Sequence, residues 1–238
     1  MGRRFTYYQM LSSFRPTDLL GSQLYYAKNT ATPSLWNDQS LNGYDLTQGV
    51  AGQQPLIGTE TVNFDGINDV QLNTTVNPFT SHTLGIIYFS GEVTSGVNSR
   101  FINISNSLAT TGRVRLSVEY VSSKISIAIR FSGLDNAFRS VSTFPTGYVY
   151  GYIKSTGTGY ELMVNGVIQT LSFTAGSNNG NWLSFVGTTN RISIGGIFTG
   201  GTVFYTPDKV NKIYYNNTAL SVGDITKLNT FFSDPTKY

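Results

Sequence analysis

Apolar and polar residues alternate in the middle of the chain from Arg113 to Tyr120, and after a polar turn at 122–124 the alternation resumes as far as Phe131. A period of two residues is typical of a strand with one buried face. Because a short turn joins the two segments, they are predicted to form an antiparallel hairpin. Its buried face is expected to consist of Val114, Leu116, Val118, Ile125, Ile127 and Ile129.

Further strands are predicted in the C-terminal half of the chain, at 148–153, 160–164, 191–194 and 210–215. The second of them ends at Asn165-Gly166, a pair that tolerates the positive φ angles of a type I′ turn. The sequence therefore predicts that residues 167–173 fold back beside 160–164 as a tight hairpin.

One short amphipathic helix is predicted near the C-terminus. Ser221 has the side chain of a helix N-cap, with Asp224 three residues further on. The apolar positions that follow are Ile225, Leu228 and Phe231 or Phe232. A weaker helical pattern covers residues 7–13, ahead of Pro16.

Composition places these elements in one domain. The chain has 238 residues, 39% of them hydrophobic, without a linker in its middle, so residues 21–238 are predicted to form a single domain after an N-terminal arm at 1–20. It has no cysteine, and its net charge is only +3. The sequence shows no signal peptide, no apolar run long enough to cross a membrane, and no dense basic patch for nucleic acid.

Five segments together resemble concanavalin A-like, laminin-G-like domains. They are 36–47 (WNDQSLNGYDLT), 62–69 (VNFDGIND), 160–166 (YELMVNG), 192–196 (ISIGG) and 217–221 (NTALS). Their order and spacing match the family over roughly residues 24 to 232. The resemblance implies an all-β, two-sheet antiparallel jelly-roll sandwich with a short C-terminal helix, in which Trp36 lies in the core and ligands bind on a concave face or at one rim.

Catalytic residues are sparse, so a non-enzymatic protein is predicted. His82 is the single histidine and is interpreted as an edge or turn residue rather than the base of a triad. The glutamates Glu60, Glu92, Glu119 and Glu161 have no second carboxylate two residues away. Glycan hydrolysis, which needs a pair of carboxylates, is therefore the less favoured alternative.

Asp65, Asn68 and Asp69 place oxygen ligands on one turn, which makes Ca²⁺ a candidate cofactor. The competing interpretation is a turn in which the same side chains accept backbone hydrogen bonds.

Aromatic residues are the candidate ligand contacts, because exposed rings can stack on sugars. Trp182 lies in a polar loop and is either a ligand-stacking residue or the anchor of that loop. Tyr148, Tyr150 and Tyr152 alternate on one strand face, either as a glycan-binding surface or as ordinary sandwich core.

The function favoured by these features is a virion structural or adhesion protein, such as a phage fibre or decoration protein, with a virion or extracellular location. Its expected partners are itself, as a homo-oligomer, other virion proteins, and a host-surface glycan. An apolar assembly arm is predicted from Phe5, Tyr7, Tyr8, Met10, Leu11 and Phe14. The main alternative is a carbohydrate-binding module of a bacterial cell surface.

Overall fold

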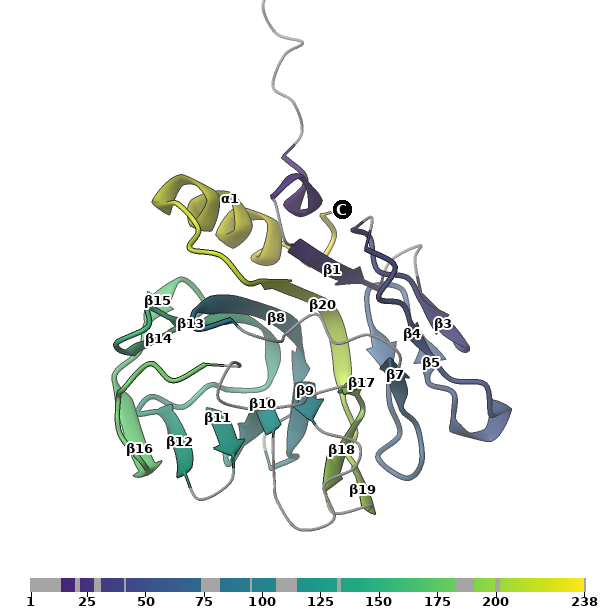
Figure 1. Ribbon diagram of the computed structural model, residues 1–238. Coiled ribbons are helices and arrows are strands. Elements are labelled where there is room, and N and C mark those ends of the chain that lie inside the picture. The colour runs from purple at the N-terminus through teal and green to yellow at the C-terminus, as the bar shows by residue number, and fades with distance from the viewer. Residues whose placement is uncertain are drawn as a thin grey trace, which may run out of the picture.

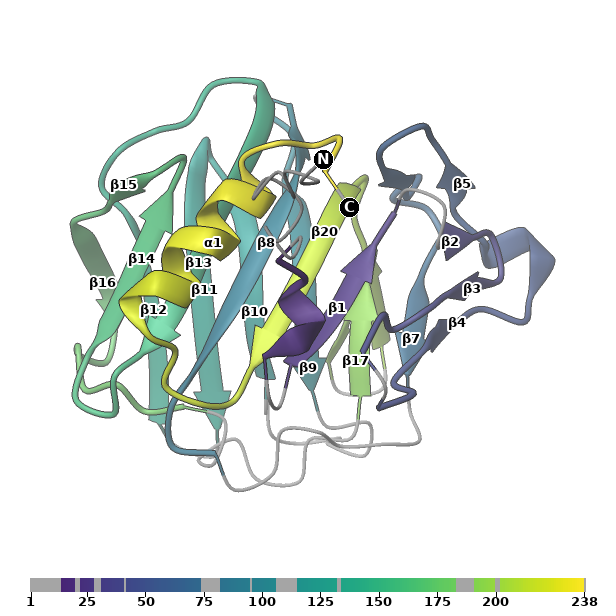
Figure 2. The same ribbon diagram turned by 90° about the horizontal axis from the view of Figure 1, so that it is seen from above.

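The computed structural model describes residues 14–19, 22–27, 31–40, 42–73, 82–94, 96–105, 115–131, 134–182, 191–199 and 202–237. Two antiparallel sheets pack face to face, and one helix, α1 (Val222–Phe232), lies across the outer side of the first sheet (Figure 1, Figure 2). This is the predicted jelly-roll sandwich with its short C-terminal helix. No helix among the described residues is both long and apolar enough to span a membrane.

The first sheet carries the helix. Its strands, in spatial order, are β15 (Val167–Ile168), β14 (Tyr160–Val164), β13 (Gly147–Ser155), β8 (Gly85–Val93), β20 (Lys209–Asn216), β6 (Val62–Asn63) and β5 (Leu56–Ile57), and β1 (Ser22–Tyr26) also pairs with β20.

The second sheet forms the opposite layer. Its order is β16 (Leu171–Ala175), β12 (Leu134–Ser140), β11 (Lys124–Phe131), β10 (Arg115–Val121), β9 (Ser99–Ser105), β17 (Arg191–Ile194), β7 (Gln71–Asn73), β4 (Leu46–Thr47), β3 (Leu35–Trp36) and β2 (Ala31–Thr32). A separate hairpin, β18 (Gly196–Thr199) with β19 (Thr202–Tyr205), follows β17, and two 3-10 turns are η1 (Pro16–Asp18) and η2 (Ala51–Gln53).

The central hairpin has the predicted register. Leu116 pairs with Ile129 and Val118 pairs with Ile127 across β10 and β11, and all four side chains are completely buried between the sheets. The alternation predicted this arrangement because one face of the hairpin had to be apolar. Val114 lies outside the described residues.

The second predicted hairpin is only partly correct. The Asn165-Gly166 turn forms with φ angles of 50° and 81°, but β15 pairs with β14 for just two residues. The chain then crosses to the second sheet, where β16 pairs with β12. This crossing places Phe173 against Phe138, with 5.0 Å between ring centroids, so the apolar side chains of β16 reach the core between the sheets.

Helix α1 closes a second, smaller core over the first sheet. The predicted cap is confirmed, since Ser221 Oγ accepts a hydrogen bond of 3.1 Å from the Asp224 backbone N–H. Leu228, Phe231 and Phe232 pack against outward-facing side chains of β8, β13 and β20. This face of the sheet is therefore apolar, although it points away from the main core.

A fully buried lysine secures the C-terminal end of α1. Lys212 of β20 is 0% exposed, and its Nζ donates hydrogen bonds to the carbonyl oxygens of Phe231 at 3.2 Å and Asp234 at 2.5 Å. The last carbonyls of a helix lack intrahelical partners and carry partial negative charge, which a cation there satisfies. Nζ also lies 4.7 Å from the centre of the Phe231 ring.

The motif at 36–47 has a structural explanation. Trp36 is completely buried, as predicted. The carboxylate of Asp38 accepts hydrogen bonds from the backbone N–H groups of Leu24, Ser40 and Tyr44. The Asp38 carboxylate thus links β1 to the loop after β3 through hydrogen bonds. The motif at 36–47 therefore has a structural role.

Candidate functional site

The three predicted tyrosines lie beneath α1. Tyr152 is 4% exposed and belongs to the apolar cluster under the helix, where Tyr150 packs at the margin. The hydroxyl of Tyr148 donates a hydrogen bond of 2.7 Å to the Phe232 carbonyl oxygen. Burial raises the pKa of Tyr148 and of Tyr152 well above the usual value. Tyr152 therefore packs under the helix, whereas Tyr148 and Tyr150 are half-buried, and a ligand-binding role for them stays a prediction.

Trp182 is not an exposed loop residue. Its side chain is 0% exposed and forms part of the main core. The loop before it is held in place by Ser155, whose Oγ donates to the Gly180 carbonyl oxygen at 2.5 Å, and by Asn178, whose Oδ1 accepts from the Tyr160 N–H at 2.6 Å. The indole anchors this loop because its large apolar surface is removed from water, and no ring face is presented to a ligand.

The turn predicted to bind calcium uses its carboxylates for backbone hydrogen bonds. Asp65 Oδ1 accepts from the N–H groups of Ile67, Asn68 and Asp69 at 2.8 to 3.3 Å, and Asp69 Oδ2 accepts from Asp65 at 3.0 Å. Burial pushes the pKa of Asp65 upward, but the backbone hydrogen bonds outweigh it and the pKa is lowered. Within the described part of the chain, no three His, Asp or Glu residues gather for a metal. Calcium binding stays a prediction.

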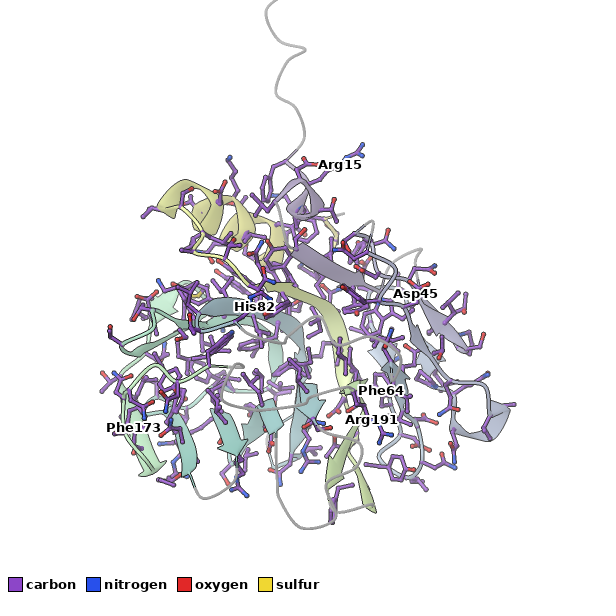
Figure 3. The ribbon with its side chains drawn as sticks, in the orientation of Figure 1. Arg15, Asp45, Phe64, His82, Phe173 and Arg191 are labelled. Atoms are coloured by element: carbon purple, nitrogen blue, oxygen red, sulfur yellow. The ribbon has the colours of Figure 1, made fainter. Side chains whose placement is uncertain are left out.

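His82 lies at the rim where β8 begins (Figure 3), and its Nε2 is 2.6 Å from the Asn217 side-chain nitrogen. Burial lowers its pKa. Nearby, a cavity of about 250 Å³ is lined by Lys154, Thr156, Thr218 and mainly apolar neighbours. The amine of Lys154 is engaged by Glu161 at 2.7 Å, so the cavity has no uncompensated charge of its own.

The outward side of the second sheet carries a different set of residues. Because alternate side chains of β10 and β11 fill the core, the others face outward. Along one row of register partners these are Ser193 of β17, Asn103 of β9, Ser117 of β10 and Ala128 of β11. All are small or polar, and each is at most 8% exposed. They form the floor of what we call the polar face.

Hydrogen bonds organise this floor. The Nδ2 group of Asn103 lies 3.2 Å from both Ser105 Oγ and Ser193 Oγ, and Ser193 Oγ donates to the Gly196 carbonyl oxygen at 2.8 Å. The Oδ1 atom of Asn103 is buried and accepts no hydrogen bond from the described residues.

Longer charged side chains border the floor. Arg100 and Glu119 form an ion pair of 3.7 Å, and Ser117 Oγ donates to Glu119 Oε1 at 2.6 Å. Arg130 and Arg191 stand in the next row and are half-buried. Figure 3 shows Arg191 in the lower layer, far from α1. The partial burial of Arg191 lowers the pKa of its guanidinium.

A buried acid lies behind this face. Asp208 is 1% exposed. Its carboxyl group accepts hydrogen bonds from the backbone N–H of Arg100 at 2.6 Å and from Thr206 Oγ1 at 2.7 Å. Burial raises its pKa to about 8. The folded chain therefore holds a proton that the unfolded chain releases near pH 4.

This proton predicts a pH-dependent stability. Between about pH 4 and pH 8 the folded state binds more protons at Asp208, so the free energy of unfolding should fall as pH rises, by up to about 1.4 kcal/mol per unit. Urea unfolding at several pH values should show this slope, and Asp208→Asn should flatten it. The exposed Asp18→Asn variant is the control; an unchanged slope in Asp208→Asn would contradict the prediction.

The sequence placed Arg130 on the outward side of the hairpin, but it did not indicate that Arg130 shares a polar face with residues of β9 and β17. Arg191 and Arg130 are 61 positions apart, and they share a face only because β17 enters the sheet beside β9. Phe204 of β19 was missed as well. It is 53% exposed, on a hairpin whose other strand contacts β9. The alternation at 113–131 predicted which residues of β10 and β11 point outward, but not which strands lie next to them.

The two packed antiparallel sheets and their strand order define the chain as a jelly-roll β-sandwich. No family model matches the sequence, and no curated protein matches it.

Solved structures match the fold at low sequence identity. The carbohydrate-binding module CBM40 of a Ruminococcus gnavus IT-sialidase, bound to α2,3-sialyllactose, has a TM-score of 0.56 and 12% identity over 71% of this chain and 96% of its own. The complex of the same module with α2,6-sialyllactose has a TM-score of 0.55 and 13% identity, over 72% of this chain and 96% of its own. A Trypanosoma rangeli sialidase in complex with sialic acid has a TM-score of 0.59 and 14% identity over 87% of this chain. The match covers only 32% of that enzyme.

Proposed function

We propose that this chain is a non-catalytic glycan-binding domain and that the polar face of the second sheet is its binding surface. The observation that carries the proposal is the floor of small polar side chains bordered by Arg100, Glu119, Arg130 and Arg191, on the layer opposite α1. Saccharide hydroxyls both donate and accept hydrogen bonds, so they suit a surface that offers amide, hydroxyl, carboxylate and guanidinium groups.

Two further observations support this location. Helix α1 packs on the outer side of the first sheet and buries Tyr152, and Tyr148 and Tyr150 are half-buried there. On the second sheet, Ser126 and Ala137 are half-buried and Arg139 is exposed, so the part of the face over β11 and β12 reaches solvent. The solved CBM40 structures, which are similar in fold, were determined with sialyllactose bound.

A bulky side chain on the face tests the proposal. The Ala137→Trp variant places an indole beside Ala128, its register partner, and should abolish glycan binding without unfolding the domain. Binding is measured on a glycan array and then by calorimetry, and folding by thermal melting. Val222→Trp, at an 81% exposed position on α1, is the matched control and should bind as the unmodified chain does.

Two outcomes would overturn the proposal: no glycan bound by the unmodified chain, or full binding retained by a folded Ala137→Trp variant. The latter would place the site elsewhere, for example at the rim cavity near Lys154.

Whether the domain belongs to a virion or to a bacterial cell surface is a separate proposal. A virion adhesion role, as predicted from the sequence, is compatible with a binding face directed away from the N-terminal segment, because Phe14 and Leu19 pack near α1 on the other layer. Antibodies against the domain should then label purified phage particles. Labelling of intact bacteria instead would favour the cell-surface alternative.

A further inference from the structure

We infer that two copies of this chain associate through β16, the edge strand of the second sheet. An edge strand has backbone N–H and C=O groups without partners on one side, and these can pair with another strand. Among the described residues, β16 pairs with β12 and with no other strand. The inference concerns association of the chain with itself and does not depend on glycan binding.

The other edges of the two packed sheets are poor templates for a second strand. The terminal strands β15, β5 and β2 are each only two residues long. The free side of β1 is covered by the loop after β3, where the Gln39 N–H donates to the Leu24 carbonyl oxygen at 2.7 Å and Tyr25 forms a bridge with Asp38. Short or covered edges resist pairing. In the described part of these two sheets, β16 is therefore the longest edge that is open to a partner.

A hydrogen bond at the start of β16 shows which of its residues point outward. The Val141 N–H donates to the Thr170 carbonyl oxygen at 3.0 Å, directly beside the paired part of β12 and β16. Backbone groups of successive residues point to alternate sides of a strand, so Ser172 is turned toward β12, whereas Leu171 and Phe173 are turned away from it. The register with β12 shifts after Phe173. These three residues therefore form the regular part of the edge.

Apolar side chains at this edge are incompletely buried. Leu171 and Phe173 are half-buried against the main core, and Figure 3 shows Phe173 at the margin of the sandwich. The first sheet ends on the same side of the molecule with β15 (Figure 1). There Val167 is 61% exposed, although its register partner Val164 lies in the core. Apolar surface is thus left in water at the ends of both sheets, and a partner that covers it is favoured.

A second copy of β16 fits this edge. In an antiparallel pair centred on Ser172, Leu171 of each copy lies opposite Phe173 of the other, and the two residues exchange both backbone hydrogen bonds. Their apolar side chains then meet on the core side of the joined sheet. Residues 162–182 contain no charged residue and no proline, so two copies neither repel each other nor lack the N–H groups that pairing needs.

This pairing fixes how the two copies are oriented. The contact is isologous, with a two-fold axis perpendicular to the second sheet. The second sheets of the two copies join into one continuous sheet. Both polar faces then lie on the same side of the dimer and point in the same direction.

Cross-linking tests the register. The chain has no cysteine, so Ser172→Cys supplies its single thiol. In the dimer the two copies of residue 172 form a non-hydrogen-bonded pair with Cα atoms about 4.5 Å apart, which suits a disulfide. Mild oxidation should therefore convert most of this variant to dimers on a non-reducing gel.

Thr170→Cys is the matched control for the cross-link. Thr170 is exposed just before the same strand, and its two copies would lie about 14 Å apart in this register, beyond the reach of a disulfide. It should remain monomeric on the gel. Equal cross-linking of the two variants would show that collisions, and not β16 pairing, bring the copies together.

Light scattering on the full chain measures the association without a cross-link. With rising concentration the mass should approach twice the 26.1 kDa of one chain. Val167→Lys places a charge on the exposed apolar margin and should weaken the association about tenfold. Leu56→Lys makes the same change at a 74% exposed position of β5, at the other end of the first sheet, and should associate as the unmodified chain does.

Thermal melting establishes that both lysine variants are folded. A chain that stays monomeric at every concentration overturns the inference, as does a folded Val167→Lys variant that associates normally. Assemblies larger than a dimer would also contradict it, because a two-fold contact through one edge closes at two copies. None of these measurements contains a glycan, so their outcome is separate from that of the proposed function.

Discussion

The Leu116→Asp variant is expected not to fold. Leu116 is completely buried between the sheets and pairs with Ile129 at the centre of the β10–β11 hairpin. An unpaired carboxylate in such a core costs several kcal/mol, which is comparable to the whole stability of a domain. Expression should give aggregated protein, or soluble protein without a cooperative thermal transition by circular dichroism.

Ser122→Asp provides the matched control for this variant. Ser122 is exposed in the turn of the same hairpin, with φ of 51°, a conformation that aspartate tolerates. It should melt close to the unmodified chain. A soluble Leu116→Asp protein with an ordinary cooperative transition would show that the buried face of the hairpin has been assigned incorrectly.

The second large effect is expected at Trp182. Trp182→Ala should lower the free energy of unfolding by about 3 to 5 kcal/mol, because it removes a fully buried indole and leaves a cavity. Urea unfolding measures the loss, and Trp182→Phe, which keeps an aromatic ring in the core, should lose less. Glycan binding by the folded fraction should be unchanged. Normal stability combined with lost binding in Trp182→Ala would instead restore the stacking role considered from the sequence.

The sequence predicted those parts of the fold that depend on local pattern. The alternation of apolar and polar residues predicted the positions of β10 and β11. The Asn165-Gly166 pair predicted a turn, and Ser221 predicted the start of α1. The crossing of β16 to the second sheet was missed, since alternation specifies which residues share a face but not which strand lies beside them.

The candidate site was harder to predict for the same reason. From the sequence, Tyr152 is a candidate ligand contact, but α1 packs over it in the structure. Trp182 is predicted to be exposed because its neighbours in the sequence are polar, whereas its neighbours in the structure are apolar. Arg191 joins Arg100 and Arg130 on the polar face from a strand that is distant in the chain, β17. The assembly arm stays a prediction, because most of its residues lie outside the described part of the chain: Phe5, Tyr7, Tyr8, Met10 and Leu11. Phe14 is described and packs near α1, where Lys227 Nζ lies 5.5 Å from the centre of its ring.

The anchoring of the chain ends has a consequence for presentation. Lys212 and Tyr26 hold residues 231–236 on the layer that carries α1, and η1 lies on that layer too, so both described ends are on the side opposite the polar face (Figure 1). Anything joined at either end would leave the polar face unobstructed. Several copies on one scaffold would then engage a glycan-coated surface together, and weak individual contacts would combine into high avidity through effective concentration.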